Sequence, residues 1–254
     1  MTNQFRKLCT IMVLSAMCIL LVNPVMAQTD GEAKSLVKWN VLGLASKNIS
    51  FQYERAVGKK ISVALNLGIT PKSGLPFKST IEDIADDDEV SRQIGGLKTG
   101  SFSITPEVRF YMGNSALKGF YLAPYVRYTT NSYELPYKFD SIDSGDGSTF
   151  ERSIFADGNT KVFTGGLMFG SQHKLGGMFY LNWWLGAGIG SISGKVTGTA
   201  SLNEQEQQEI RDQLNDIDVP LIDLESQVNN NGVRIDVSGT GISARLGLAI
   251  GIRF

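Results

Sequence analysis

The last fourteen residues, GISARLGLAIGIRF, constrain the fold of this chain more than any other stretch. Apolar side chains alternate with small or polar ones along the whole segment, and a period of two is the pattern of a β-strand with two unlike faces. Such a strand must pair with neighbours that share its pattern and must keep its apolar face away from water. The apolar positions are Ile242, Ala244, Leu246, Leu248, Ile250, Ile252 and Phe254.

Seven further segments of similar length alternate in the same way, so the sequence predicts eight strands. Strands of about ten residues have the length that a tilted membrane strand needs. The predicted strands are 36–46, 48–57, 61–69, 99–112, 119–130, 160–172, 178–190 and 241–254.

The connections between these strands alternate in length. Three short turns and three long polar segments follow one another, which is typical of an outer-membrane barrel with short periplasmic turns and long extracellular loops. The sequence therefore predicts an all-β fold, an eight-stranded antiparallel up-and-down transmembrane β-barrel with long extracellular loops. The short turns are 57–60, 113–118 and 173–177, and the long segments are 71–98, 131–158 and 191–233.

The composition of the two strand faces favours lipid on the outside. The less apolar face carries mainly Gly, Ser, Ala, Asn and Thr, whereas a water-washed surface would carry more Lys and Glu. Small residues fit inside an eight-stranded barrel, whose interior is filled by side chains. Aromatic residues near the strand ends suit interfacial girdles. These are Trp39, Tyr53, Tyr111, Tyr128 and Trp183.

The amino terminus has the features of a secretory signal. Arg6 and Lys7 precede the apolar run IMVLSAMCILLV, and Ala27 ends a cleavage site. We therefore expect residues 1–27 to be removed and residues 28–254 to form one barrel domain in the outer membrane. The chain has two cysteines, Cys9 and Cys18, and both lie in the signal, so the mature chain is expected to hold no disulfide and no thiolate metal site.

Several function classes find little support in the sequence. The net charge of −1 becomes −3 once Arg6 and Lys7 are removed, and no basic excess points to nucleic acid. His173 is the one histidine and falls in a predicted periplasmic turn, so Ser-His or Cys-His catalysis has no clear base. The acidic run 86–89 matches no EF-hand spacing, which favours a solvated loop over a metal site or divalent bridging to lipopolysaccharide. We expect no enzyme activity, no catalytic residue and no cofactor.

Six charged residues are predicted to face the lumen. An unpaired charge is costly in a narrow interior of low dielectric, so these side chains are expected to form ion pairs and hydrogen bonds that plug the barrel. A selective pore for small polar solutes is the alternative. The six residues are Lys38, Glu54, Glu107, Arg109, Arg127 and Arg245.

The last long segment carries a helix signal. Ser201 and Glu204 have the spacing of a capping box, and apolar residues then recur at steps of three and four. This stripe either packs on the barrel mouth as a lid, which we favour, or forms a docking surface outside the cell. Its members are Ile210, Leu214, Ile217, Leu221, Leu224 and Val228.

Two stretches carry a family resemblance. The run KWNVLGLASKNISFQYERAVGKKISVALNLGI, with its Tyr53-Glu54-Arg55 and Gly58-Lys59-Lys60 motifs, and the run KGFYLAPYVRY resemble a domain-of-unknown-function family of small Bacteroidetes outer-membrane barrels. The aromatic carboxy terminus resembles the closing strand of bacterial outer-membrane barrels, which the assembly machinery reads. The resemblance implies a fold, a location and an assembly signal at Phe254, and no established activity.

Together these features favour a structural or surface-interaction protein of the outer membrane with a plugged lumen. Its loops would contact a ligand, a partner or lipopolysaccharide, and its expected partners are outer-membrane lipid, lipopolysaccharide and the assembly machinery, not nucleic acid. A small channel or carrier for polar or apolar solutes is the alternative, and an enzyme acting on outer-leaflet lipid ranks last.

Overall fold

The computed structural model describes residues 33–80, 95–142, 149–215, 217 and 219–254. The predicted signal, residues 1–27, and the acidic run 86–89 lie outside the described residues. Residues Lys34–Phe254 form one compact unit.

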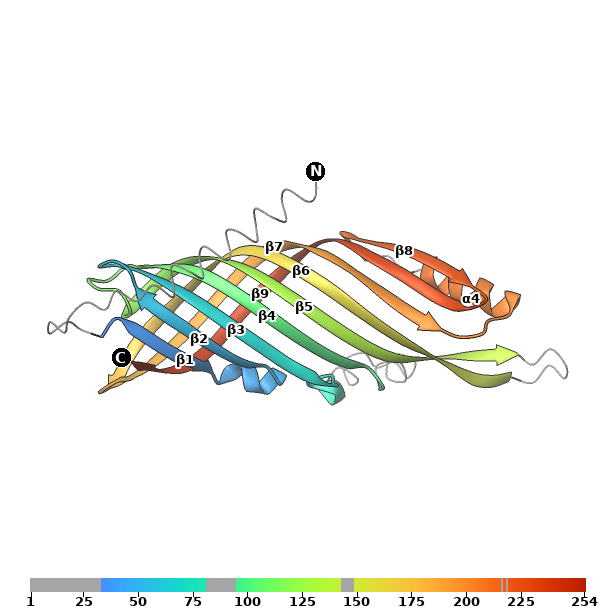
Figure 1. Ribbon diagram of the computed structural model, residues 1–254, viewed down its shortest axis with the longest axis horizontal. Helices are drawn as coiled ribbons and strands as arrows, with labels where there is room; N and C mark the ends of the chain where they lie inside the picture. Colours follow the sequence, from blue (N-terminus) through green and yellow to red (C-terminus); the bar gives the residue numbers. More distant parts are fainter. Residues whose placement is uncertain (1–32, 81–94, 143–148, 216, 218) are drawn as a thin grey trace, which may run out of the picture. The chain divides into compact units, whose positions relative to one another are not determined.

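Eight antiparallel strands of the described chain close into a barrel (Figure 1). Each strand pairs with the next along the chain, β7 pairs with β9, and β1 pairs with β9 to complete the ring. The predicted all-β, eight-stranded up-and-down barrel is confirmed. The strands are β1 (Ser35–Asn40), β2 (Ile49–Ala56), β3 (Ile61–Gly74), β4 (Lys98–Tyr111), β5 (Gly119–Ile142), β6 (Thr149–Gly176), β7 (Phe179–Thr199) and β9 (Gly232–Arg253).

The carboxy-terminal strand closes the barrel through its last residue. Leu36 of β1 pairs with Arg253, and Phe254 then exchanges two backbone hydrogen bonds with Ser35, at 2.9 and 3.0 Å. The Phe254 side chain is exposed on the outer surface. Because β1 and β9 pair with one another, neither strand leaves an open sheet edge there. An open edge would be a site for unwanted pairing with strands of other molecules.

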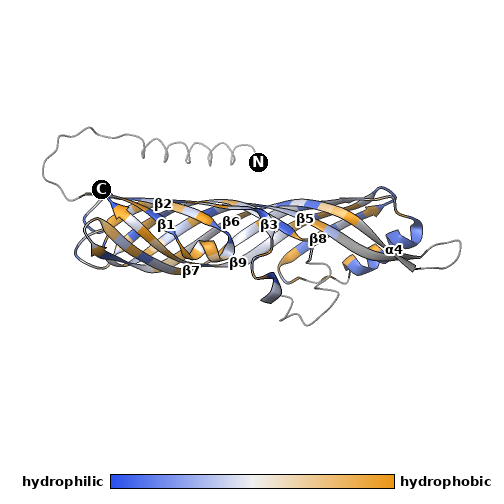
Figure 2. Ribbon diagram, turned by 90° about the horizontal axis from the view of Figure 1, so that it is seen from below, coloured by the Kyte–Doolittle hydropathy of each residue, from blue (hydrophilic) through white to orange (hydrophobic). Residues whose placement is uncertain are grey.

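The strand faces point as the alternation predicts. Large apolar side chains of the barrel are exposed on the outside, and the buried inward side chains are mostly small or polar, with a few large aromatic ones. Hydrophobic and hydrophilic residues alternate along the barrel strands (Figure 2). On β9 the outward apolar row runs from Ile242 to Ile252, which is about 34 Å along the strand and about 26 Å along the barrel axis at a tilt of about 40°. That height matches the apolar band of a transmembrane barrel.

Bulky inward side chains are accommodated by glycines on the facing strand. A Cβ added at Gly247 would lie 2.1 Å from the Trp184 ring, so the indole occupies the space above that glycine. Tyr121 lies in the same way over Gly170. The predicted aromatic girdle is wrong at Tyr111, because an odd-numbered residue of β4 points inward, and its ring is buried in the lumen.

The first predicted strand is too long. β1 ends at Asn40, and Leu42–Ser46 form a 3-10 helix, η1, which ends at Lys47 in the left-handed conformation. The Asn48 backbone N–H donates to the Gly43 carbonyl at 2.9 Å and turns the chain into β2. The apolar Leu42 and Leu44 that blur the alternation belong to this helix.

The long segments are in large part not loops. β5 and β6 form a hairpin whose pairing continues to Ile142 and Thr149, far into the predicted segment 131–158. The segment 191–233 contains the ends of β7 and β9, the helix α4 (Glu204–Asn215) and the strand β8 (Ile222–Asn229), which pairs with β9 outside the barrel ring. The predicted turn 173–177 is also wrong, because β6 continues to Gly176.

The outer face changes character along one row of cross-strand neighbours, Thr130, Lys161, Ser193 and Ser238. On the side of the short turns the outward residues are mainly apolar. Beyond the row they are mainly polar, as at Asp157, Lys195 and Arg234. We call the part beyond this row, together with α4 and β8, the head.

Candidate functional site

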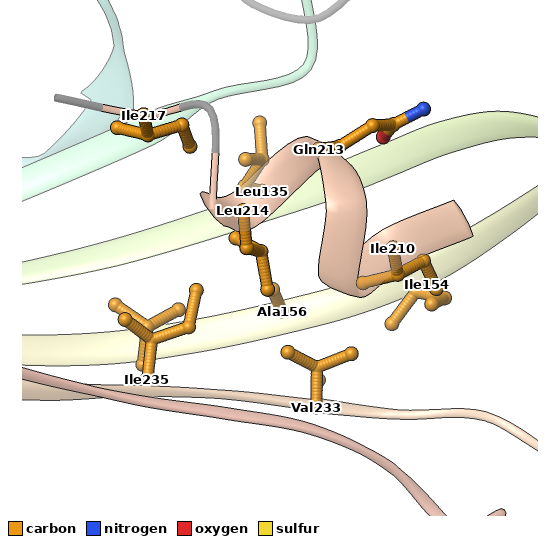
Figure 3. A pocket seen from close by; sticks show the side chains of 11 residues that line it. Leu135, Ile154, Ala156, Ile210, Gln213, Leu214, Ile217, Val233 and Ile235 are labelled. Atoms are coloured by element: carbon orange, nitrogen blue, oxygen red, sulfur yellow. The ribbon is translucent and has the colours of Figure 1, made fainter. Parts of the chain in front are cut away.

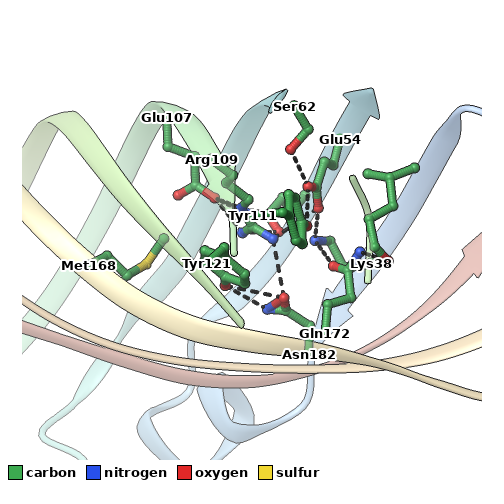
Figure 4. Close-up of polar contacts among 12 residues, drawn as sticks. Lys38, Glu54, Ser62, Glu107, Arg109, Tyr111, Tyr121, Met168, Gln172 and Asn182 are labelled. Atoms are coloured by element: carbon green, nitrogen blue, oxygen red, sulfur yellow. Dashed lines mark hydrogen bonds and ion pairs between the residues drawn. The ribbon is translucent and has the colours of Figure 1, made fainter. Parts of the chain in front are cut away.

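The lumen holds a chain of side chains with alternating charges, in the half of the barrel that carries the short turns (Figure 4). Lys38 pairs with Glu54, Glu54 pairs with Arg109, Arg109 pairs with Glu107, and Glu107 pairs with Arg245. The Arg109 Nη1–Glu54 and Arg245 Nη1–Glu107 contacts are both 2.8 Å. All five side chains are buried, so five of the six predicted lumen charges form the predicted network.

Uncharged side chains complete the hydrogen bonds of the two carboxylates. Tyr111 donates its hydroxyl to Glu54 at 2.7 Å, and Ser62 donates to the same carboxylate. Gln52 donates to Glu107 at 2.7 Å and accepts from the Arg109 guanidinium at 2.8 Å. A buried charge is tolerated when its remaining hydrogen-bond sites are satisfied, which these groups accomplish.

These uncharged members of the network are not among the residues predicted from the sequence. Gln52 and Ser62 share the inward parity of the charges on β2 and β3, so their positions were a usable signal. The carboxylate that each side chain contacts depends on the stagger between neighbouring strands. The alternation pattern does not predict this stagger.

The turn between β4 and β5 lies beneath the network. Leu117 in this turn is fully buried, and its carbonyl accepts a hydrogen bond of 2.8 Å from Gln172. Gln172 in turn accepts from Lys38 at 2.9 Å. The turn therefore covers the network from the short-turn end of the barrel.

Arg127 does not join the network. Its Nη2 donates to Ser103 at 3.2 Å, and no carboxylate among the described residues pairs with it. Four cations and two carboxylates give the lumen set a formal charge of +2. The prediction that Arg127 belongs to the charge network is therefore wrong, although its side chain does point inward.

The head reverses the polarity of the barrel. Its inward positions continue the lumen-facing rows of β5, β6, β7 and β9, but most of them carry apolar side chains or are glycine, and Asn131 and Thr160 are polar exceptions next to the boundary row. The helix α4 packs on this surface, where Ile210 and Leu202 are buried against Ile154. Apolar residues on the inside and polar ones on the outside are the arrangement of a water-soluble domain.

The helix begins two residues later than predicted. The Asn203 side chain accepts from the Glu206 backbone N–H at 2.8 Å, and the Glu206 carboxylate accepts from the Asn203 N–H at 2.9 Å. This reciprocal pair is a capping box. The prediction that a capping box starts the helix is confirmed, but Asn203 and Glu206 form it instead of Ser201 and Glu204.

The predicted stripe is not one helical face. Ile210 and Leu214 lie on α4, which ends at Asn215, whereas Leu224 and Val228 lie on β8 and pair with Val237 and Val233. A spacing of four fits a helix, but two residues four apart, such as Leu224 and Val228, also lie on the same face of a strand. Ile217 and Leu221 are exposed in the connection. The α4 part of the stripe packs as a lid, which is the interpretation that we favoured.

A cavity of about 160 Å³ lies between α4 and the inward face of the head (Figure 3). Its lining residues come from β5, β6, β7 and β9, from α4 and from Ile217 after the helix, so they span about one hundred residues of the sequence, from Leu135 to Ile235. The lining residues are Leu135, Ile154, Ala156, Val196, Gly198, Ile210, Gln213, Leu214, Ile217, Val233 and Ile235.

His173 lies on β6, exposed on the outer face, and not in a turn. Its Nε2 is 2.8 Å from the Ser171 hydroxyl, and the two side chains share the outward face of the strand. Ser171 is fully buried beside the aromatic cluster of Phe120, Phe169 and Trp183. No carboxylate among the described residues orients the imidazole, and a covered hydroxyl is a poor nucleophile.

The described residues contain no group of three or more His, Cys, Asp or Glu side chains that could hold a metal ion. Within the same ranges no helix is long and apolar enough to cross a membrane.

Comparisons with known proteins add little to this description. No family model matches the chain, and no curated protein matches it. Among solved structures, the N-terminal β-barrel domain of Pseudomonas aeruginosa OprF aligns over 89% of this chain and 100% of that chain, with 10% identity and a TM-score of 0.26. A TM-score of this size supports no argument, and the fold rests on the strand pairing described above.

Proposed function

We propose that this chain is a non-enzymatic protein of the bacterial outer membrane. Its sealed barrel anchors the head at the cell surface, where the head contacts a ligand, a partner or lipopolysaccharide. The observation that carries this proposal is the reversal of polarity at the row Thr130, Lys161, Ser193 and Ser238. The same strands present an apolar outer face for lipid on one side of the row and a polar outer face for water on the other.

The lumen supports an anchoring role over a transport role. The network residues Glu54, Glu107 and Arg109 are between 0 and 3% exposed, and Leu117 covers them from the short-turn end. Eight strands leave an interior that side chains can fill. A solute path would have to break several buried ion pairs at once.

The orientation follows from the connections. Short turns are typical of the periplasmic side and long elements of the extracellular side of outer-membrane barrels, so the head is assigned to the cell surface. Phe254, exposed at the end of the closing strand, is proposed as the signal that the assembly machinery reads. Export would remove residues 1–27.

Single cysteines test location and orientation together. With Cys9 and Cys18 both in the signal, Asp223→Cys on β8 or Lys59→Cys in the β2–β3 turn would be the one thiol of the mature chain, and both positions are exposed. A membrane-impermeant maleimide should label Asp223→Cys in intact cells and Lys59→Cys only after the outer membrane is opened. The reverse pattern, or equal labelling of both positions in intact cells, would overturn the proposal.

A further inference from the structure

We propose that the cavity beneath α4 is a binding site for a small uncharged apolar ligand, of the size of a benzene ring or a six-carbon chain. The inference rests on the proposed function, because it gives the surface-exposed head a ligand class. It concerns the head alone and makes no use of the lumen.

The cavity lies between two layers, which we call its floor, made of strands, and its roof, made of α4 (Figure 3). Strand residues such as Ile154, Val196 and Ile235 form the floor, and Ile210 and Leu214 of α4 form the roof. Ile154 and Ile210 are buried and close one end. Ile217 lies at the other end and is exposed, and the exposed Gln213 side chain points away from the strands, so this side of the cavity is open to the surrounding water (Figure 3).

The lining selects against charge. Ten of the eleven lining residues are apolar or glycine, and the eleventh, Gln213, lies at the exposed end. A charged or strongly hydrogen-bonding group would lose its hydration inside without gaining a partner. An apolar group loses no hydrogen bond and removes apolar surface from water, which favours its entry.

The volume sets the size of the ligand. A buried apolar cavity of about 150 Å³ stays dry and takes up benzene, which makes 160 Å³ sufficient for a six-membered ring. Pockets for drug-sized molecules are roughly 300–1,000 Å³, so a larger compact ligand would not fit.

The roof is fixed over the floor by polar contacts outside the cavity. The capping box of Asn203 and Glu206 holds the start of α4. Arg211 donates to the Val228 carbonyl of β8 at 2.9 Å and ties the middle of the helix to the sheet. On the floor, Gly198 has no side chain to fill the space, and a Cβ there would lie 2.7 Å from Ile154 Cγ2. The capping box and the Arg211 contact therefore hold α4 in place over the sheet.

Methyl NMR of the full barrel in lipid nanodiscs tests the site with toluene as the probe. The Ile210 and Ile235 methyls report on the cavity, and the lipid-facing Ile61 and Ile252 methyls report on partition into the bilayer. We expect saturable shifts at the first pair and only gradual, non-saturating shifts at the second. Hexanoate, which carries a charge on a chain of similar size, should leave the cavity methyls unshifted.

Two variants introduce the same aromatic ring at different faces of the sheet. Ala156→Phe fills the cavity from its floor and should abolish the saturable shifts, whereas Thr199→Phe adds the same ring to the exposed outward face and should keep them. Val196→Leu is the milder filling variant and should weaken toluene binding even if Ala156→Phe displaces α4. Non-saturating shifts at all four methyls, saturable binding that survives both filling variants, or equal binding of hexanoate would overturn the site.

The two proposals fail separately. If toluene shows no saturable binding while Asp223→Cys is still labelled on intact cells, the ligand site is wrong and the surface-exposed barrel stands. If Asp223→Cys is not labelled from outside, the proposed function is wrong whatever toluene does.

Discussion

The lumen and the head use the same inward rows of the same strands in opposite ways. On β9, Arg245 points into the lumen and joins a chain of buried charges, while Ile235, ten residues earlier on the same face, lines an apolar cavity. The difference follows the character of the outer face. Where the outward residues are mainly apolar, polar side chains gather inside, and where they are mainly polar, apolar side chains gather inside.

The two regions also differ in what holds them together. A buried ion network contributes little net stability relative to an apolar core, but removing one member leaves partners buried without compensation. The head depends on apolar burial under α4 and on local caps, each of which acts on one element. Damage to the lumen should therefore spread through the barrel, and damage to the head should stay local.

The largest expected effect comes from Glu54→Leu. The substitution leaves Lys38 and Arg109 buried without their shared carboxylate, which should destabilise the barrel by about 3–5 kcal/mol. Urea unfolding in lipid vesicles, followed by tryptophan fluorescence, measures the change. Ser132→Ala in the head is the control and should unfold as the wild type does; equal stability of Glu54→Leu would show that the network is dispensable.

A smaller effect is expected from Gly247→Leu. The new side chain would occupy the space of the Trp184 ring, and overpacking of this kind costs about 1–3 kcal/mol. The same unfolding assay and the shift of tryptophan emission report it. Adding Trp184→Ala should restore part of the lost stability, and no recovery would mean that the two residues do not compete for space.

Asn203→Ala should act on the head alone. It removes the capping side chain of α4, and the loss is about 1 kcal/mol in the opening free energy of that helix. Hydrogen exchange of the α4 amides should accelerate, while urea unfolding of the barrel stays unchanged. Gln208→Ala on the exposed face of α4 is the control; a drop in barrel stability with Asn203→Ala would break the separation of the two regions.

The smallest effect concerns an exposed pair in the head. A hydrogen bond and the charge of Lys72 lower the pKa of Glu134 below its ordinary value of 4.5. A carboxyl whose folded pKa is lowered adds stability above its unfolded pKa, and this is lost as the pH falls through the folded pKa. Carbon NMR titration of the Glu134 carboxyl should give a midpoint below 4.5, and Lys72→Gln should move it upward; an unchanged midpoint would mean that the pair is not formed in solution.

Strand periodicity was sufficient to predict the barrel and its faces. Apolar and polar residues alternate around Glu54 on β2, Glu107 on β4 and Arg245 on β9, so the sequence predicts that all three point inward. The connectivity of the charges did not, because the contact of Arg109 with Glu54 across the lumen depends on strand stagger. Arg127 shows the limit of alternation as a guide, since it points inward and donates to Ser103 but pairs with no carboxylate among the described residues.

The strands of the head could not be predicted because their outward residues are polar. Polar outward residues of β6 such as Asp157 are typical of a loop, and they favour the prediction of a loop over 131–158 although Ile154 and Ala156 alternate with them. In the last segment, the spacing of Leu221, Leu224 and Val228 continues that of the helix and predicts more helix, although Leu224 and Val228 lie on strand β8. The cavity could not be predicted, because it arises where four strands and α4 meet.

The central claim is that the lumen, and not the head, seals the barrel. Thr199 and Gly232 are cross-strand partners, so residues 200–231 can be replaced by a two-residue Asn-Gly turn without altering the ring. Planar-bilayer recording of the refolded full barrel and of this trimmed form should show no steady conductance above that of the bare lipid. Stable, solute-dependent channels from either protein would contradict the account.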